Sequence, residues 1–190
     1  TIPAQTLSNS TANPITVNYV ATATTGGGAS CPGSSFTYTI TVLPVPSVTQ
    51  PTSQTVCNGA STTAVTFSGV ATVYNWTNNT TSIGLAASGS GNIASFTAVN
   101  GTASPVTATI TVTPQYTQNG TTCTGASQNF TITVNPTPTA NTVSNQSVCV
   151  GAATTAVNFG SAVSGTTYSW TNSNPAIGIG AGPTPGNLGS

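Results

Sequence analysis

The chain has 190 residues, and none of them is Lys, Arg, Asp, Glu or His. General acid-base catalysis needs a side chain that exchanges a proton near neutral pH, and nucleic-acid binding draws its affinity from contacts of Lys and Arg with phosphate. Calcium and magnesium sites depend on carboxylate oxygens, and catalytic zinc sites usually depend on histidine. The composition therefore argues against a conventional enzyme and a nucleic-acid-binding protein, and it predicts no catalytic residue, cofactor or metal site.

The remaining composition is typical of folded β-structure. Val, Ile, Tyr and Phe alternate with Thr over several segments, which is the pattern of strands that bury one face. No apolar run approaches the roughly 20 residues that a transmembrane helix needs, so we expect no membrane insertion. The chain begins at Thr1 with neither a Met nor a secretory signal, so we expect a processed or excerpted chain.

A repeat of about 92 residues organises the chain. Cys31 and Cys123 are 92 residues apart, and so are Cys57 and Cys149. Long fixed periods of this kind mark arrays of one repeated unit, and a unit of this size can bury a core of its own. The recurring strings are 36–42 with 129–134, 54–59 with 146–151, 63–67 with 155–159, and 74–78 with 168–172.

Residues 1–44 are expected to be the C-terminal half of an immunoglobulin-like unit. Their last run, 36–42, alternates apolar residues with Thr, as the last run of the next unit does. Prolines 44 and 46 follow it and predict a short, semi-rigid linker, because proline restricts its own backbone and that of the residue before it.

Residues 45–136 are expected to form one complete unit. Short β-like runs are separated by turn residues, and no segment repeats with a helical period. Seven such runs with a Trp on the third predict an all-β, immunoglobulin-like sandwich of two sheets. The runs are 54–57, 62–67, 72–77, 83–87, 93–98, 105–113 and 128–134.

Residues 137–190 are expected to be the N-terminal half of the next unit, after a second linker with prolines 136 and 138. Half units expose unpaired strand edges, and such edges seek partners. Two explanations remain open. The chain is an excerpt of a longer covalent array, or it is a subunit that polymerises head to tail by strand complementation.

Four strings of the middle unit resemble a known family. They are Gln54-Thr-Val-Cys-Asn-Gly59, Tyr74-Asn-Trp-Thr-Asn78, Thr107-Ala-Thr-Ile-Thr-Val-Thr-Pro114 and Phe130-Thr-Ile-Thr-Val-Asn-Pro136. They resemble the PKD-like, immunoglobulin-like tandem repeats of giant cell-surface adhesins in Bacteroidota, including gliding-motility adhesins. The resemblance implies an extracellular, cell-surface protein that serves adhesion or motility.

The cysteines lack the Cys-x-x-Cys spacing of a metal site, so disulfides in an oxidising compartment are expected. In a seven-stranded unit, we expect the first strand and the loop before the last strand to meet at one pole. This predicts a disulfide between Cys57 and Cys123. Cys31 and Cys149 are each expected to pair with a cysteine of an adjoining repeat or of another molecule.

The aromatic residues Trp76, Trp170, Tyr74 and Tyr168 are predicted to lie in the cores of their units. The alternative is a platform on which sugars stack, and the exposure of Tyr74, Trp76 and Tyr116 distinguishes the two.

The function predicted from these features is a structural segment of an extracellular repeat adhesin, stalk or filament that mediates surface attachment or motility. The alternative is a carbohydrate-binding module of a secreted protein. The expected partners are neighbouring repeats or like subunits arranged head to tail, together with surface glycans.

Overall fold

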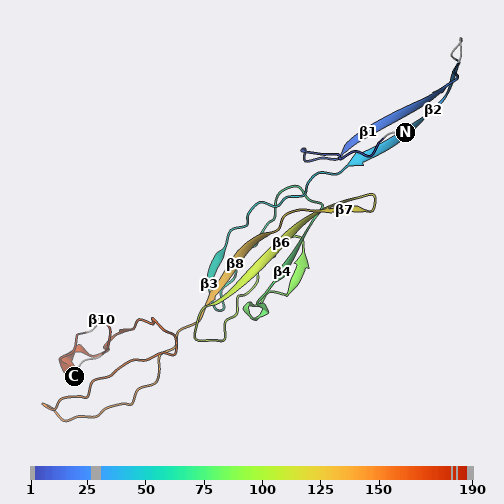
Figure 1. The fold of residues 1–190 in the computed structure, drawn as a ribbon. Coiled ribbons are helices and arrows are strands. Elements are labelled where there is room, and N and C mark those ends of the chain that lie inside the picture. The colour runs from blue at the N-terminus through green and yellow to red at the C-terminus, as the bar shows by residue number, and fades with distance from the viewer. Residues whose placement is uncertain (1–2, 27–30, 181, 183, 188–190) are drawn as a thin grey trace.

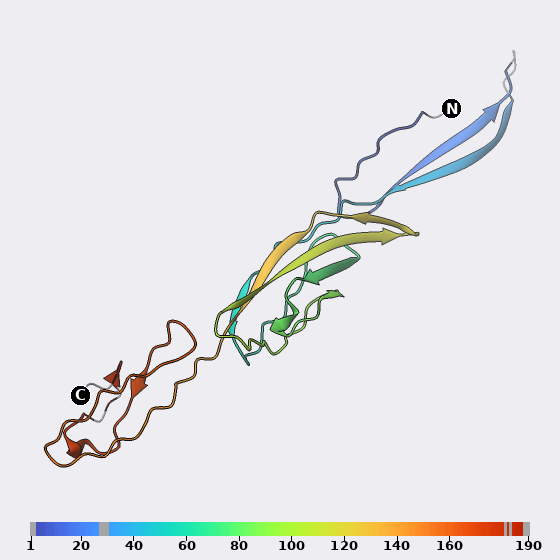
Figure 2. The ribbon, with the colours of Figure 1, turned by 60° about the horizontal axis from the view of Figure 1, so that its bottom comes forward.

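The computed structural model describes residues 3–26, 31–180, 182 and 184–187, and the predicted all-β fold class is confirmed. Figures 1 and 2 show an N-terminal hairpin, a middle part and a C-terminal part that follow one another in a row. Helical structure within the described ranges is limited to two single-turn 3-10 helices, η1 (Thr81–Ile83) and η2 (Pro175–Ile177). The strands are β1 (Ile15–Thr24), β2 (Pro32–Val42), β3 (Gln54–Cys57), β4 (Val73–Asn78), β5 (Ser88–Ser90), β6 (Val106–Gln118), β7 (Thr121–Thr124), β8 (Gln128–Asn135), β9 (Ser169–Trp170) and β10 (Thr184–Pro185).

The middle part is a sandwich-like arrangement of two layers. The larger layer is a sheet with strand order β3-β8-β6-β4-β5, and β7 pairs with the far end of β6. The second layer consists of segments 47–49, 61–70 and 93–98, which are joined by a hydrogen bond from the Thr49 N–H to the Ser68 carbonyl (2.7 Å) and by two isolated bridges. β3 runs parallel to β8, whereas the other pairs of this sheet are antiparallel.

Strict alternation along β6 and β8 builds the core. Ala108, Ile110 and Val112 of β6 have no exposed area, and Thr residues between them lie on the other face. Fully burying a Val or Ile side chain stabilises the fold by roughly 1.5–3 kcal/mol. The complete buried cluster is Val48, Val65, Phe67, Trp76, Ile83, Leu85, Ile93, Ala98, Ala108, Ile110, Val112, Phe130, Ile132 and Val134.

Local geometry requires a glycine at positions 89 and 120. Gly89 of β5 lies opposite Trp76 of β4, and a Cβ at this position would collide with the indole ring. Gly120 has a φ of 78° and follows Asn119, whose φ is 49°. An Asn-Gly pair with both φ values positive is the preferred two-residue turn of a hairpin, so it reverses the chain between β6 and β7.

The predicted runs agree with the strands only in part. Runs 54–57, 72–77, 105–113 and 128–134 coincide with β3, β4, β6 and β8. Runs 62–67 and 93–98 do not form continuous strands. They lie in segments that pair with each other only through two isolated bridges, Ser61 with Thr97 and Val65 with Ile93. The predicted strand 83–87 is wrong, since Ile83 ends η1 and Gly84 continues with a φ of 94°. Strand β7 was not predicted.

The N-terminal hairpin repeats the register of the middle part. Val17 pairs with Ile40 as Ala108 pairs with Ile132, and Tyr19 pairs with Tyr38 as Ile110 pairs with Phe130. An asparagine network precedes each hairpin. The Nδ2 of Asn9 donates to the carbonyls of Asn13 and Val42, and the Nδ2 of Asn100 donates to those of Ser104 and Val134.

The C-terminal part repeats details of the first half of the middle part. Gln146 and Thr155 exchange two 2.8 Å hydrogen bonds, as Gln54 and Thr63 do. The rings of Phe159 and Tyr168 lie 5.7 Å apart, the same spacing as the rings of Phe67 and Tyr74. The named strands of this part, within the residues described, are β9 and β10, which pair with each other.

Candidate association surfaces and the cysteine positions

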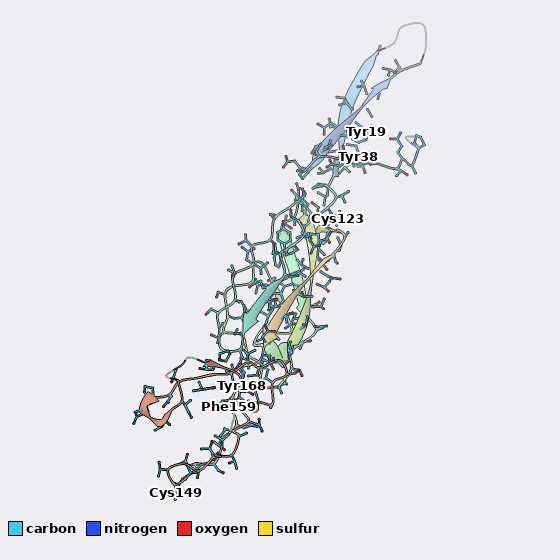
Figure 3. All side chains as sticks on the ribbon, turned by 90° about the vertical axis from the view of Figure 1, so that its left-hand side faces the viewer. Tyr19, Tyr38, Cys123, Cys149, Phe159 and Tyr168 are labelled. Atoms are coloured by element: carbon cyan, nitrogen blue, oxygen red, sulfur yellow. The ribbon has the colours of Figure 1, made fainter. Side chains whose placement is uncertain are left out.

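One face of the N-terminal hairpin exposes side chains at positions whose equivalents in the middle part are buried. Val17 is 36% exposed and Tyr38 is 54% exposed, whereas Ala108 and Phe130, which have the same register positions, are 0% and 2% exposed. Figure 3 shows Tyr19 and Tyr38 together on this hairpin, and their ring centroids are 6.5 Å apart. We call the surface formed by Ile15, Val17, Tyr19, Tyr38 and Ile40 the apolar hairpin face.

The segment that leads into the hairpin covers only part of this face. Residues 3–7 leave a hollow of about 200 Å³ between themselves, the two tyrosines and Ile40. Leu7 at the end of this segment remains 40% exposed. The face is therefore open to a further layer.

The C-terminal part also exposes aromatic side chains whose counterparts in the middle part are buried. Phe159, Tyr168 and Trp170 are only half-buried, although Phe67 and Trp76 in the equivalent places are core residues. Phe67 contacts Phe130 of β8 with ring centroids 6.4 Å apart, whereas the aromatic ring that Phe159 contacts among the described residues is that of Tyr168. A groove of about 300 Å³ adjoins Phe159, and its apolar lining residues are Val143, Val157, Phe159 and Ile179.

The middle part shows which strands pair with the counterparts of the C-terminal segments. There β4 pairs with β6 so that Trp76 lies opposite Val112, and β3 pairs with β8 so that Gln54 lies opposite Ile132. β9 holds the equivalent Trp170, and its pairing within the described chain is with β10 alone. The hairpin β1–β2 has the same register as β6 and β8.

The aromatic residues of the middle part do not form an exposed platform. Trp76 is 7% exposed and belongs to the core, and Tyr74 packs against that core. Tyr116 on β6 is half-buried. In the C-terminal part, Trp170 and Tyr168 are half-buried, and the indole N–H groups of both tryptophans are buried without a hydrogen-bond partner.

The structure places Cys57 and Cys123 at opposite ends of the middle part. Cys57 ends β3 and lies beside Asn135, the last residue of β8, whereas Cys123 in β7 lies opposite Tyr116 near the far end of β6. The two levels are about ten residues apart along β6, which is roughly 30 Å at 3.3 Å per residue, and a disulfide requires Cα atoms within about 7 Å. The predicted Cys57–Cys123 disulfide is therefore wrong, because β3 is parallel to β8 and its end points away from β7.

All four cysteines are free in the structure. Cys31, Cys57 and Cys149 are exposed and Cys123 is half-buried. In Figure 3, Cys123 lies at the end of the middle part that faces the hairpin, and Cys149 lies at the outer tip of the C-terminal part. Among the described residues, no three cysteines or other ligand side chains gather into a metal-binding group, and no helix is long and apolar enough to cross a membrane.

The stability of the fold should be independent of pH from about pH 4 to 8, because no Asp, Glu, His, Lys or Arg titrates. Burial raises the pKa of Tyr74 above its ordinary value of 10.0, so Tyr74 ionises more readily in the unfolded chain. This contribution to stability is fully present below about pH 10 and is lost as the pH rises further. Thermal unfolding measured across this range, at low and moderate salt, checks the prediction. A shift of many degrees between pH 4 and 8 would contradict it.

No protein-family model and no curated protein sequence matches this chain.

Proposed function

We propose that this chain is a structural segment of an extracellular stalk or filament built of tandem immunoglobulin-like units, and that the assembly mediates surface attachment or motility. Residues 45–136 are the complete unit, residues 1–44 the C-terminal half of the preceding one and residues 137–190 the N-terminal half of the following one. Each unit passes its chain to the next through a proline-containing linker.

The observation that carries this proposal is the recurrence of the same local structure along one direction. The register of β6 with β8 returns in β1 with β2, and the reciprocal Gln–Thr hydrogen bonds of residues 54 and 63 return at residues 146 and 155. Figure 2 shows the corresponding parts in a row. A linear series of like units separates its two ends, and this separation is the mechanical task of a stalk.

The linkers support a semi-rigid connection. Pro44, Pro46 and Pro136 of the two linkers are buried. The carbonyl of Pro46 contacts Gly125, and the Nδ2 of Asn58 donates to the Thr137 hydroxyl at 3.2 Å. Buried and hydrogen-bonded linkers restrict bending between neighbouring units, because bending would break these contacts.

Small-angle scattering of the reduced chain at low concentration tests the shape that a stalk needs. A compact chain of this length has a radius of gyration of about 16 Å. We expect a clearly larger value and a pair-distance distribution with a long tail, and a value near that of a compact chain would contradict the proposal. Glycan-array binding of the same preparation addresses the alternative function, since saturable binding would favour a carbohydrate-binding module.

A further inference from the structure

The two cysteines of each unit mark its two ends. We call the end of the middle part that receives linker 43–46 the leading end, and the end that passes into linker 135–138 the trailing end. Cys123 is at the leading end, two residues from Gly125, which contacts the Pro46 carbonyl. Cys57 is at the trailing end, one residue from Asn58, whose backbone N–H and side chain bind Asn135 and Thr137. Each thiol is therefore next to a linker. Cys57 is exposed and Cys123 is half-buried, so both thiols are accessible to a reaction partner.

In a row of units, the trailing end of one unit lies next to the leading end of the following unit. A trailing-end cysteine and a leading-end cysteine therefore lie on the two sides of each boundary. The linker residue contacted at the trailing end is Thr137, and the residue equivalent to Pro46 is Pro138, 92 positions later and directly next to Thr137. At such a boundary, Thr137 therefore contacts the trailing end of one unit, and the adjacent Pro138 has the position that contacts the leading end of the next unit. The two thiols at these ends are thus close to neighbouring linker residues. A bond inside one unit is excluded by the length of β6, whereas a bond across the boundary spans only the linker.

We propose that the cysteines form disulfides across the boundary between adjoining units, a trailing-end cysteine of one unit with a leading-end cysteine of the next. This inference rests on the tandem arrangement proposed above. Cys31 has the position of Cys123, and Cys149 has the position of Cys57. Within this chain the required partners do not face one another, which agrees with four free thiols in the structure.

A second copy of the chain supplies the partners. The apolar hairpin face of one copy completes the C-terminal part of another, because β1 and β2 have the register that β6 and β8 use to close the middle part. By the pairing of Trp76 with Val112, Trp170 then lies opposite Ala21, and by the contact of Phe67 with Phe130, Phe159 meets Tyr38 of the other copy. The unit completed in this way has Cys31 of the second copy at its leading end and Cys149 of the first copy at its trailing end. Its leading end follows the middle part of the first copy, so Cys31 comes next to Cys57 of the first copy. Its trailing end precedes the middle part of the second copy, so Cys149 comes next to Cys123 of the second copy.

The bond forms by exchange with a low-molecular-weight disulfide such as glutathione disulfide. The Cys57 thiolate attacks one sulfur and releases one glutathione thiolate. The Cys31 thiolate of the second copy then attacks the mixed disulfide and releases the other. One S–S bond is broken and one is formed, the two cysteines are oxidised, and the two glutathione thiolates take up the two protons.

Four double variants of the full chain, incubated with glutathione disulfide, test this pairing on non-reducing gels. Cys31→Ser with Cys57→Ser leaves Cys123 and Cys149, and Cys123→Ser with Cys149→Ser leaves Cys31 and Cys57. Both should give ladders of covalent oligomers that collapse to monomer with reductant. The matched variant Cys57→Ser with Cys123→Ser leaves Cys31 and Cys149 and should give no ladder. Cys31→Ser with Cys149→Ser should form no intramolecular disulfide.

Peptide mapping of the wild-type oligomers gives the direct assignment. Trypsin has no site in a chain without Lys and Arg, but chymotrypsin cuts at aromatic residues and places each cysteine in a separate peptide. The expected cross-links join peptide 20–36 with peptide 39–67, and peptide 117–130 with peptide 131–159.

Three results would overturn the inference: a ladder from the variant that retains Cys31 and Cys149, an internal Cys57–Cys123 bond, or a wild-type chain that stays monomeric without a disulfide between its cysteines after incubation with glutathione disulfide. Each of these leaves the scattering test of the elongated shape unaffected. Loss of the elongated shape in that test would instead contradict the stalk proposal itself.

Discussion

Replacing Trp76 with Ala is expected to lower the free energy of unfolding of the middle part by about 3–5 kcal/mol. The indole is 7% exposed, belongs to the central cluster and fills the space above Gly89 on the adjacent strand. Ala would leave a cavity that the rigid strands on both sides cannot close. Urea unfolding followed by circular dichroism measures the change without depending on tryptophan fluorescence.

The matched control is Trp170→Ala in the reduced, dilute chain. Trp170 has the equivalent position in β9 but is only half-buried, so its replacement should change the main unfolding transition by less than about 1 kcal/mol. Equal losses for the two variants would contradict the assignment of Trp76 to a core that the C-terminal part does not share.

Replacing Asn100 with Ala is expected to destabilise the middle part by about 2–4 kcal/mol, because several buried polar groups lose their partners at once. The Asn100 Nδ2 donates to the carbonyls of Ser104 (2.9 Å) and Val134 (2.7 Å), and its Oδ1 accepts from the Thr102 N–H (2.9 Å) and hydroxyl (2.8 Å). The residue is 4% exposed, so water cannot replace these bonds without opening the loop before β6. The same denaturation experiment measures the effect.

Asn9→Ala provides the control for this variant. Asn9 makes the same set of hydrogen bonds, to Thr11, Asn13 and Val42, at the start of the N-terminal hairpin. Its replacement should leave unfolding of the middle part unchanged and weaken only the hairpin. If both variants lowered the main transition equally, the hairpin and the middle part would have to unfold as one cooperative unit.

The strands with strict alternation were predictable from the sequence. Along 106–112 and 130–134, every second residue is apolar, and burying that face determines both the strand and its orientation. β7 was missed because Thr121-Thr-Cys-Thr124 has no apolar alternation, although the preceding Asn119-Gly120 is a recognisable hairpin signal. The run 83–87 resembled a strand in composition, but Gly84 takes a left-handed backbone that ends η1.

The burial of Trp76 could likewise be inferred from the residues, because it depends on the local pattern of its strand. The positions of the cysteines could not. The spacing of Cys57 and Cys123 is the same whether β3 runs parallel or antiparallel to β8, since strand direction leaves no mark on the alternation of side chains.

The sequence by itself determined the absence of charged side chains, the β-structure and the residues able to form a core, since each of these follows from composition or from alternation along the chain. Only the tertiary structure decided which end of the unit each cysteine occupies, because that depends on β3 joining β8 in parallel. It also decided that the hairpin keeps the register of β6 and β8 while its apolar face stays open, because pairing between two strands sets their register and burial requires a second layer.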